Sequence, residues 1–338
     1  MKAQRLATCH YGVMDLWALS DLCTPWCVYV VATLRIADHN VAGNTEIDKL
    51  AVAAGADPES LHRVLRHLVS KGPSSKSRCP AASRSYEASR ALLDDQIRLG
   101  LDLEGALAVA WRRPWGTLLS AVRTGRPAYH EAFGREFWED LAANPEIAAS
   151  FDTLMGPTGH GVPDSQVLVD PADWESVRTV VDVGGGTGAL LAEVLRAKPE
   201  IRGTLIDLPR TVARSGEVLQ AAGVADRVTT VGQSFFDPLP AGQDLYLLKS
   251  VLGDWPDREA QTILRRCAEA ARPSGRVVIL NGVVPDENPS PALLMMVLVG
   301  GRERTLSEVR ELAREAGLEV RAAGRQASGR FVVECRPT

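Results

Sequence analysis

The sequence lacks the features that would make this 338-residue chain a membrane protein, a disulfide-bonded secreted protein or a nucleic-acid binder. Its longest apolar stretches, residues 28–34 and 292–299, are far shorter than the ~20 residues that a membrane helix needs. Residues 1–10 carry charges without the apolar run and small-residue cleavage site of a secretory signal. The six cysteines show no C-x-x-C spacing, which suits reduced thiols better than disulfides or a zinc site. With 38 basic against 42 acidic residues, the chain has no positive field for a phosphate backbone. We therefore expect a cytoplasmic protein with no metal, no membrane contact and no nucleic-acid partner.

What the chain does contain is enough apolar residues, 45%, to bury the cores of two domains. Residues 13–71 show helical periodicity, and Asp57-Pro58-Glu59 opens a helix with one apolar face and one face of histidines and arginines. The second face is either the recognition helix of a helix-turn-helix or a solvated surface, and the net charge of −4 favours the surface. Residues 72–90 are small and polar, as in a loop. Residues 91–155 return to helical periodicity, and the glycines and prolines of 156–171 indicate a linker.

Strands and helices alternate after residue 173, which predicts a parallel sheet covered by helices on both faces. The predicted strands of this alternation are residues 179–183, 202–207, 227–231, 244–248 and 275–281, and two further strand candidates follow at 318–322 and 330–335. A helix is predicted at 305–316. The sequence therefore predicts an α/β protein with a helical domain at 1–90, a helical linker and pocket region at 91–170, and an α/β domain at 171–338.

A carboxylate precedes a glycine turn at the end of the first of these strands. Residues 180–188 read Val-Val-Asp-Val-Gly-Gly-Gly-Thr-Gly. Gly184, Gly186 and Gly188 lack Cβ atoms, so a ligand can approach the N-terminus of the helix that follows. The spacing also fits a loose dinucleotide pattern, so NAD competes with S-adenosylmethionine (SAM) as the ligand. Asp182 favours SAM, because a carboxylate attracts the ammonium of a methionine tail and repels a pyrophosphate.

Two further candidate contacts follow the second and third strands. Asp207 ends the second strand, roughly 20 residues past the turn, where it can accept hydrogen bonds from both hydroxyls of a ribose. After the third strand, Phe235 can cover the face of an adenine and Ser234 can hydrogen-bond to its edge. The competing interpretation of Asp207 is a helix N-cap, and that of Phe235 is an ordinary core residue. The register of Asp207 relative to Asp182 favours a nucleoside site.

Together, five segments resemble the SAM-dependent small-molecule O-methyltransferases. They are residues 180–188, 203–209, 234–240, 244–257 and 300–305. Residues 124–129 and 137–141 further resemble the bacterial branch that works on polyketides, including anthracycline-type methyltransferases. The resemblance implies a Rossmann-like class I methyltransferase domain with an N-terminal α-helical, winged-helix-like domain. In this family that domain serves homodimerisation, so the resemblance to a helix-turn-helix does not imply DNA binding. The short 72–90 segment departs from the family's wing, which normally reads as a hairpin.

Carried over position by position, the resemblance also implies site residues. The implied contacts to the cofactor, SAM, are Asp182, Gly184, Gly186, Gly188, Asp207, Leu208, Ser234, Phe235 and Lys249. Ser234 differs from the commoner aspartate. The implied substrate-lining residues, each able to pack on a flat aromatic molecule, are Trp138, Phe151, Met295 and Met296.

The catalytic histidine of many family members is missing here. In those members it stands before Asp-Trp and removes the proton from a phenol; here the position is Gly253, and the acidic residue that often steadies the histidine is Asn281. A positioned base contributes ~10² to 10⁴ in rate, or roughly 3 to 5 kcal/mol, whereas orientation supplies ~7 to 11 kcal/mol of the barrier. We therefore expect in-line methyl transfer driven by proximity. Asp254, Glu303 and His160 are the candidate replacement bases.

The expected function is thus O-methylation of a phenolic hydroxyl on an aromatic or polyketide natural product. The glycine at position 253 keeps an alternative open, in which the SAM-binding fold supports hydroxylation, decarboxylation or cyclisation instead. A DNA-binding regulator that uses residues 42–71 is a third hypothesis, which the acidic balance disfavours.

Overall fold

The computed structural model describes residues 19–71, 89–156, 164–287 and 289–338. The chain divides into two compact units, Met1–Val109 and Ala110–Thr338. His160 and nearly all of the expected 72–90 loop lie outside the described residues. The three-region division at residues 90 and 170 stays a prediction.

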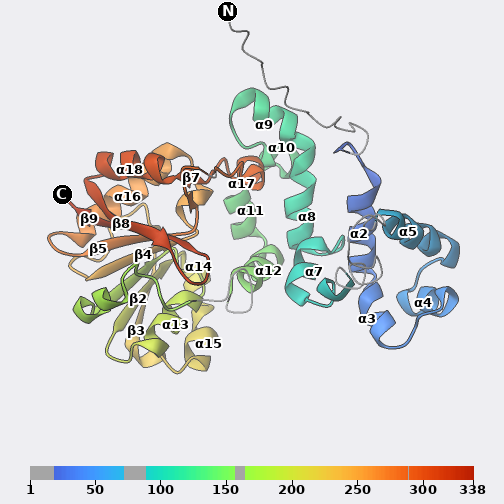
Figure 1. Cartoon of the computed structure of the whole chain (residues 1–338), viewed down its shortest axis with the longest axis horizontal. Coiled ribbons are helices and arrows are strands. Elements are labelled where there is room, and N and C mark those ends of the chain that lie inside the picture. Colours follow the sequence, from blue (N-terminus) through green and yellow to red (C-terminus); the bar gives the residue numbers. More distant parts are fainter. Residues whose placement is uncertain (1–18, 72–88, 157–163, 288) are drawn as a thin grey trace, which may run out of the picture. The chain divides into compact units, whose positions relative to one another are not determined.

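The described part of the first unit is helical (Figure 1). Its helices are α2 (Cys23–Thr33), α3 (Ile36–Val41), α4 (Ile47–Ala54), α5 (Pro58–Lys71) and α7 (Asp95–Leu101), and α8 (Ala106–Arg112) crosses into the second unit. The predicted amphipathic helix is α5. Its first turn is capped by the Asp57 carboxylate, which accepts a hydrogen bond from the Ser60 backbone N–H at 2.8 Å. Its apolar face buries Leu61 against Val31 and Leu50. The helical N-terminal region is therefore confirmed.

The second unit begins with short helices that precede the sheet. They are the 3₁₀ turn η1 (Arg113–Thr117), α9 (Leu118–Thr124), α10 (Tyr129–Phe133), α11 (Phe137–Ala143), α12 (Pro145–Met155) and the 3₁₀ turn η2 (Pro171–Ser176). The buried Tyr129 hydroxyl donates a hydrogen bond to Asp140 Oδ2 at 2.8 Å, which ties α10 to α11. This tie fixes α11, the helix that later contributes Trp138 to the site.

The centre of the second unit is a seven-stranded sheet of order β3-β2-β1-β4-β5-β9-β8. The strands are β1 (Thr179–Val183), β2 (Arg202–Asp207), β3 (Val228–Gly232), β4 (Leu245–Lys249), β5 (Arg276–Leu280), β8 (Leu318–Arg325) and β9 (Phe331–Pro337). The pairs among β1 to β5 are parallel, whereas β9 runs antiparallel to both β5 and β8. All seven predicted strands are confirmed, and so is the parallel pairing expected of the five strands that alternate with helices. The two further predicted strands, β8 and β9, add an antiparallel edge to that sheet. The connection between β8 and β9 is too short for the crossover that parallel strands require, so the two form a hairpin.

Helices cover both faces of this sheet (Figure 1). They are α13 (Ala189–Ala197), α14 (Pro209–Val212), α15 (Ser215–Ala221), α16 (Asp257–Ala271) and α18 (Leu306–Glu315), with η3 (Ala225–Arg227), η4 (Leu252–Asp254) and α17 (Leu293–Leu298) in the connections. One apolar core lies between α16, α18 and the sheet, and a second lies between α13, α15 and the opposite face. A two-stranded parallel sheet, β6 (Val283–Val284) with β7 (Arg304–Thr305), was not predicted because each strand has only two residues.

Within the described ranges, every helix is too short or too polar to cross a membrane. From β1 the chain adds β2 and β3 on one side of β1, and then adds β4 and β5 on its other side, so the strand order reverses between β1 and β4. In open α/β sheets this reversal opens a crevice where ligands bind. The topology therefore places a site at the ends of β1, β2 and β4.

Candidate active site

The glycine turn after β1 is anchored to the neighbouring strand. Gly184 N–H and Gly185 N–H both donate to the Ile206 carbonyl, at 2.8 and 3.2 Å. Gly184 and Gly186 have left-handed backbones, with φ of 69° and 61°, which glycine adopts without steric cost. A Cβ on Gly186 would meet no atom within 4 Å, so this side of the turn is open. The turn therefore leaves room for a ligand at the start of α13.

Asp182 lies beneath this turn, where it is 1% exposed. A Cβ added to Gly185 would come within 2.5 Å of the Asp182 carboxylate, so the turn can pack on the carboxylate only because it is glycine. Burial raises the pKa of Asp182 to about 7, although the nearby Lys249 ammonium opposes the shift. Its Oδ2 atom has no hydrogen-bond partner among the described residues. A buried carboxylate with an unused oxygen is suited to a cationic ligand group.

Asp207 joins the end of β2 to the glycine turn. Its Oδ2 accepts a hydrogen bond from Gly186 N–H at 2.8 Å, and its Oδ1 accepts one from Leu208 N–H at 2.7 Å. Burial raises its pKa, and the backbone hydrogen bonds from Gly186 and Leu208 partly offset this. The Thr211 side chain also hydrogen-bonds to this carboxylate, whose two oxygens together offer about four acceptor sites, so it can still accept from a ligand hydroxyl.

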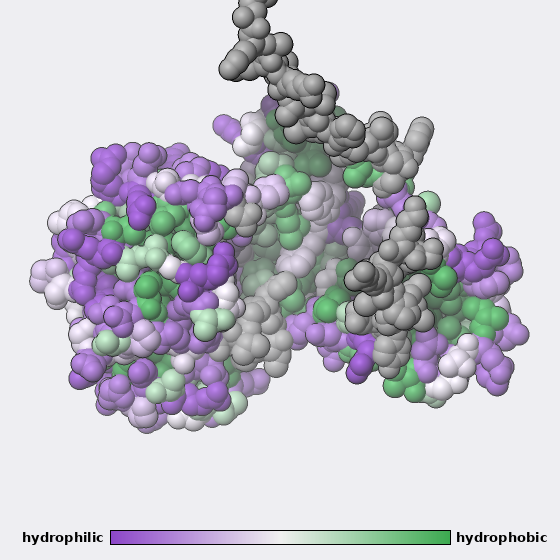
Figure 2. Space-filling model, in the orientation of Figure 1, coloured by the Kyte–Doolittle hydropathy of each residue, from purple (hydrophilic) through white to green (hydrophobic). Residues whose placement is uncertain are grey.

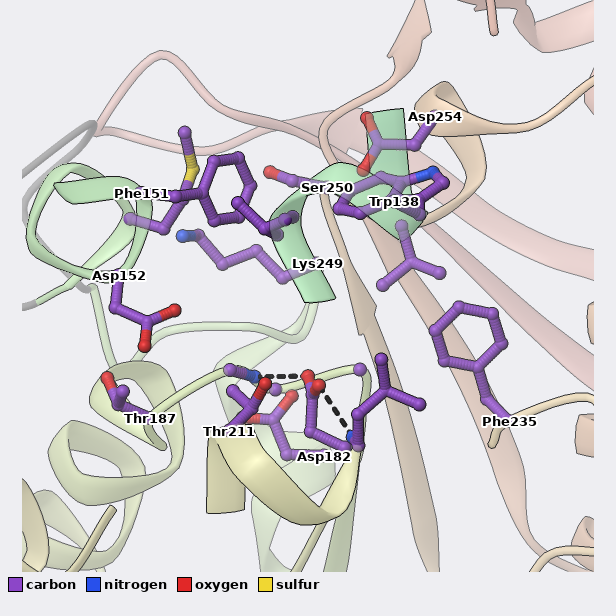
Figure 3. A pocket seen from close by; sticks show the side chains of 18 of the residues that line it. Trp138, Phe151, Asp152, Asp182, Thr187, Thr211, Phe235, Lys249, Ser250 and Asp254 are labelled. Atoms are coloured by element: carbon purple, nitrogen blue, oxygen red, sulfur yellow. Dashed lines mark hydrogen bonds between the residues drawn. The ribbon is translucent and has the colours of Figure 1, made fainter. Parts of the chain in front are cut away.

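A cavity connects these groups to an aromatic wall (Figure 3). All of its lining residues belong to the second unit. It brings together most of the predicted site residues, namely Trp138, Phe151, Asp182, Gly184, Gly186, Asp207, Leu208, Ser234, Phe235, Lys249 and Asp254. Figure 3 shows Asp182 and Thr211 at one end of the cavity and Trp138 and Asp254 at the other. The site thus has a polar end at the strand edge and an aromatic end.

Aromatic rings form the wall at the second end. The Trp138 and Trp255 rings are stacked, with centroids 6.1 Å apart and an interplanar angle of 16°. Phe151 meets Trp138 edge-on at 6.0 Å, and Phe235 meets Trp255 edge-on at 6.0 Å. Flat faces of this kind bind flat aromatic molecules by stacking and apolar burial.

Asp254 is the carboxyl group in this aromatic wall. It ends η4, one residue after Gly253 and one before Trp255. Burial raises its pKa to about 7, because taking a carboxylate out of water disfavours its charged form. A carboxyl group that titrates near neutral pH in a cavity is a candidate proton acceptor.

Four other predicted residues lie outside the lining of the cavity, and a fifth is not among the described residues. Gly188 caps α13, and a Cβ there would stand 3.1 Å from Leu205, so this glycine serves close packing of helix on strand. Met295 and Met296 lie on α17, which packs against η1 and α9, and neither is among the residues that line the cavity. Glu303 also lies outside that lining. His160 falls outside the described residues.

The cavity also contains charged residues that sequence reasoning missed. Asp152 on α12 forms an ion pair with Arg214, which follows α14, and Arg210 of α14 lies in the same lining. The four-residue spacing of the two arginines after Pro209 was a usable signal, since such residues share a helix face. No local sequence pattern indicates Asp152, because its partner, Arg214, is about 60 positions away along the chain. No group of His, Cys, Asp and Glu within the described ranges is arranged to hold a metal ion.

Comparison with known proteins agrees with this geometry. Residues 115–319 match a family model described as an O-methyltransferase domain. The 2,7-dihydroxy-5-methyl-1-naphthoate 7-O-methyltransferase of Streptomyces carzinostaticus is 43% identical, over 93% of this chain and 94% of the relative. Aclacinomycin 10-hydroxylase RdmB of Streptomyces purpurascens is 40% identical, over 89% of this chain and 82% of the relative.

A solved structure matches the same fold. The crystal structure of the O-methyltransferase NcsB1 from neocarzinostatin biosynthesis, in complex with SAM and 2-hydroxy-5-methyl naphthoic acid, has a TM-score of 0.80 and 40% identity. The match covers 95% of this chain and 98% of that one. Since the family model spans more than half of the chain and the relatives match nearly all of it, the chain belongs to the O-methyltransferase family and is an S-adenosylmethionine-dependent O-methyltransferase.

Proposed function

We propose that this enzyme methylates a phenolic hydroxyl of a flat aromatic natural product of the polyketide type. The observation that carries the proposal is the position of Asp254 in the aromatic wall formed by Trp138 and Trp255. Stacked indoles favour a planar acceptor, and a carboxylate beside them can take the proton of a hydroxyl. The naphthoates named for two of the matched proteins are planar aromatic acids and support this class of acceptor.

The polar end of the cavity fits the cofactor. SAM supplies an electrophilic methyl group when it is bound. Asp207 would accept hydrogen bonds from the ribose hydroxyls, the open side of Gly186 would face the amino-acid tail, and the unused oxygen of Asp182 would attract its ammonium. Gly184 lets Phe235 approach the turn, since a Cβ there would lie 3.3 Å from the Phe235 ring. That ring and Ser234 would bind the adenine.

We propose Asp254 as the proton acceptor. Its carboxylate takes the proton of the phenolic hydroxyl, the oxygen forms a bond to the methyl carbon, and the electron pair of the carbon–sulfur bond stays on sulfur. Gly253 offers no side chain for this step, and Glu303 lies outside the lining of the cavity. A pKa of about 7 leaves much of the Asp254 carboxylate unprotonated at neutral pH while keeping it basic.

Orientation provides most of the remaining rate enhancement in this proposal. The stacked pair of Trp138 and Trp255 fixes the plane of the acceptor, while Asp207 fixes the nucleoside. Holding oxygen, methyl carbon and sulfur in line converts a bimolecular reaction into one within a single complex. The acceptor hydroxyl therefore needs only modest help from a base.

A labelling experiment tests the proposed reaction. The purified enzyme would be incubated with methyl-labelled SAM and 2,7-dihydroxy-5-methyl-1-naphthoate, 1,4-dihydroxy-2-naphthoic acid or anthracycline aglycones. We expect label in the product, as a phenolic methyl ether by mass spectrometry. An unlabelled product with one added oxygen would overturn the proposal in favour of hydroxylation, the activity named for the RdmB relative. Asp254→Asn should lower kcat by about 10² to 10⁴.

The enzyme is also proposed to act in the cytoplasm as a homodimer joined by its first unit. Apolar side chains of that unit are exposed, including Trp26 at 52% and Val52 at 81%. Figure 2 shows hydrophobic residues at the surface over α4 and α5. Such exposure is typical of an interaction surface. Light scattering should give twice the chain mass, and Val52→Asp should shift it towards the monomer; a wild-type monomer at micromolar concentration would contradict the dimer.

A further inference from the structure

Arg304 is a fully buried arginine in the run that follows α17. Its guanidinium donates three short hydrogen bonds: Nη1 to the Leu252 carbonyl at 2.7 Å, Nη2 to the Trp255 carbonyl at 2.7 Å, and Nε to Asp257 Oδ1 at 2.9 Å. All three acceptors lie in one short stretch of chain, some 50 residues away in sequence. A buried arginine with this pattern holds a backbone segment in place.

The segment that Arg304 holds carries the proposed proton acceptor. The Leu252 and Trp255 carbonyls stand on either side of Gly253 and Asp254, so the guanidinium spans the turn from end to end. Trp255 is also half of the stacked pair that walls the cavity. The same three hydrogen bonds therefore set the position of a carboxylate and an indole that face the acceptor.

The backbone around Arg304 packs directly on the other side of this turn. A Cβ on Gly301 would come within 2.6 Å of the Asp254 carbonyl carbon, so glycine is required for this approach. Arg304 N–H donates to the Gly282 carbonyl at 3.0 Å, and a Cβ on Gly282 would lie 3.1 Å from Gly253 N. The turn is thus enclosed by two glycine backbones and one guanidinium.

The carboxylate that pairs with Arg304 is Asp257 and not Asp254. Asp257 pairs with both Arg302 and Arg304, and their hydrogen bonds outweigh burial and lower the pKa of Asp257. For Asp254, burial is the cause of the raised pKa, with no charge effect from a described neighbour. The elements next to the turn carry further charged groups, among them Lys249 on β4, Asp257, Arg258 and Glu259 at the start of α16, and Arg302, Glu303 and Arg304 in the run before α18.

We propose that Arg304 is a positioning residue for methyl transfer, which holds the Leu252–Trp255 turn so that Asp254 and Trp255 keep their places in the cavity wall. The inference rests on the proposed function, in which Asp254 accepts the proton. It predicts the direction in which the pKa of Asp254 changes when the turn is loosened. Loosening the turn admits water to Asp254, which lowers its pKa towards the ordinary value and misplaces the carboxylate.

Arg304→Lys tests this claim, because lysine keeps the charge but cannot hydrogen-bond to three acceptors with a rigid fork. We expect kcat for a naphthoate acceptor to fall about 10- to 100-fold, with KM for SAM changed less than about threefold. The acid limb of the kcat profile should move to lower pH by roughly one pH unit. An influence of Arg304 through its charge alone predicts no change in this variant.

Arg276→Lys is the matched control. Arg276 is 5% exposed and pairs with Asp173 at 2.8 Å and Glu334 at 3.5 Å, outside the lining of the cavity. Hydrogen exchange followed by mass spectrometry should show faster exchange in residues 250–257 for Arg304→Lys and unchanged exchange there for Arg276→Lys. Equal effects of the two variants on this segment and on the pH profile would overturn the proposal.

The double variant Arg304→Lys with Asp254→Asn separates this inference from the function on which it rests. If Arg304 acts through Asp254, adding Arg304→Lys to Asp254→Asn should cost less than about threefold in kcat. A full additional loss of 10- to 100-fold would overturn the proposal that Arg304 acts by placing Asp254. If Asp254→Asn alone keeps wild-type kcat, the proposed proton acceptor is wrong. Should Arg304→Lys not fold, Asp257→Ala removes one of the three acceptors at a half-exposed side chain. It should give a smaller fall in kcat and a shift of the acid limb in the same direction, to lower pH. An unchanged acid limb and an unchanged kcat would contradict the proposal.

Discussion

Asn281 donates a hydrogen bond from its side-chain amide to Ser250 Oγ at 3.0 Å, and both residues have left-handed backbones, with φ of 63° and 58°. Each follows directly on a strand, Ser250 after β4 and Asn281 after β5. Non-glycine residues in this conformation cost free energy and cluster at functional sites. Here the pair turns two neighbouring strands into the cavity wall, which Ser250 lines.

Two substitutions of Asn281 should separate strain from hydrogen bonding. Both Asn281→Gly and Asn281→Ala remove the donor to Ser250, but only glycine accepts a φ of 63° without strain. We expect the alanine variant to have a free energy of unfolding about 1 kcal/mol lower than the glycine variant. Urea denaturation of both variants measures this difference. Equal stabilities would mean that the backbone at residue 281 relaxes freely.

Asp207 is expected to dominate affinity for the cofactor. Asp207→Ala removes the support of Gly186 N–H and the two charge-assisted hydrogen bonds that we propose to the ribose hydroxyls, so the Kd for SAM should rise at least about 100-fold. Isothermal titration calorimetry measures it directly. Asp226→Ala, at an exposed carboxyl on η3, is the control and should bind as the wild type does. Unchanged affinity in Asp207→Ala would place the nucleoside elsewhere.

The raised pKa of Asp254 also predicts how stability varies with pH. Its pKa in the folded protein is about 7, above the ordinary 3.8, so between these values the folded state holds a proton that the unfolded chain has released. This contribution to stability is fully present below the unfolded pKa and is lost as the pH rises through 7. The free energy of unfolding should therefore fall from pH 5 to pH 8, and Asp254→Asn should reduce that fall by roughly 2 to 3 kcal/mol at most.

Denaturant titrations of the cofactor-free protein at both pH values measure this effect. Asp226→Asn serves as the control and should show the same fall as the wild type. An identical fall in Asp254→Asn would mean that water reaches the Asp254 carboxyl and that burial does not raise its pKa.

The fold and the polar half of the site were predictable because their signals are local. Alternating apolar runs gave the strands, and Asp182 and Asp207 stand at fixed places beside a glycine turn and a strand end. The pairings of Arg304 with the 252–257 stretch and of Asp152 with Arg214 join residues about 50 to 60 positions apart, and nothing in the local pattern indicates them. Only the tertiary packing shows which buried arginine holds which turn.

Position 253 offers the sharpest test of how this enzyme manages without the family histidine. A Cβ on Gly253 would lie 3.5 Å from Gly282 Cα, an ordinary contact, and Gly253 is not among the glycines with positive φ. The backbone of residue 253 therefore tolerates a side chain, and Gly253→His should fold, as a urea denaturation of the variant would show.

The catalytic effect of Gly253→His should depend on residue 254. In the wild-type background the new imidazole should raise kcat less than about threefold, because in the proposed mechanism Asp254 already accepts the proton. In the Asp254→Asn background it should restore at least about tenfold, since a positioned base contributes ~10² to 10⁴. Initial rates with a naphthoate acceptor across pH 5 to 9 measure both effects. A large gain in the wild-type background would show that Asp254 is not an adequate base, because an added group can only speed a proton transfer that the existing residues perform poorly.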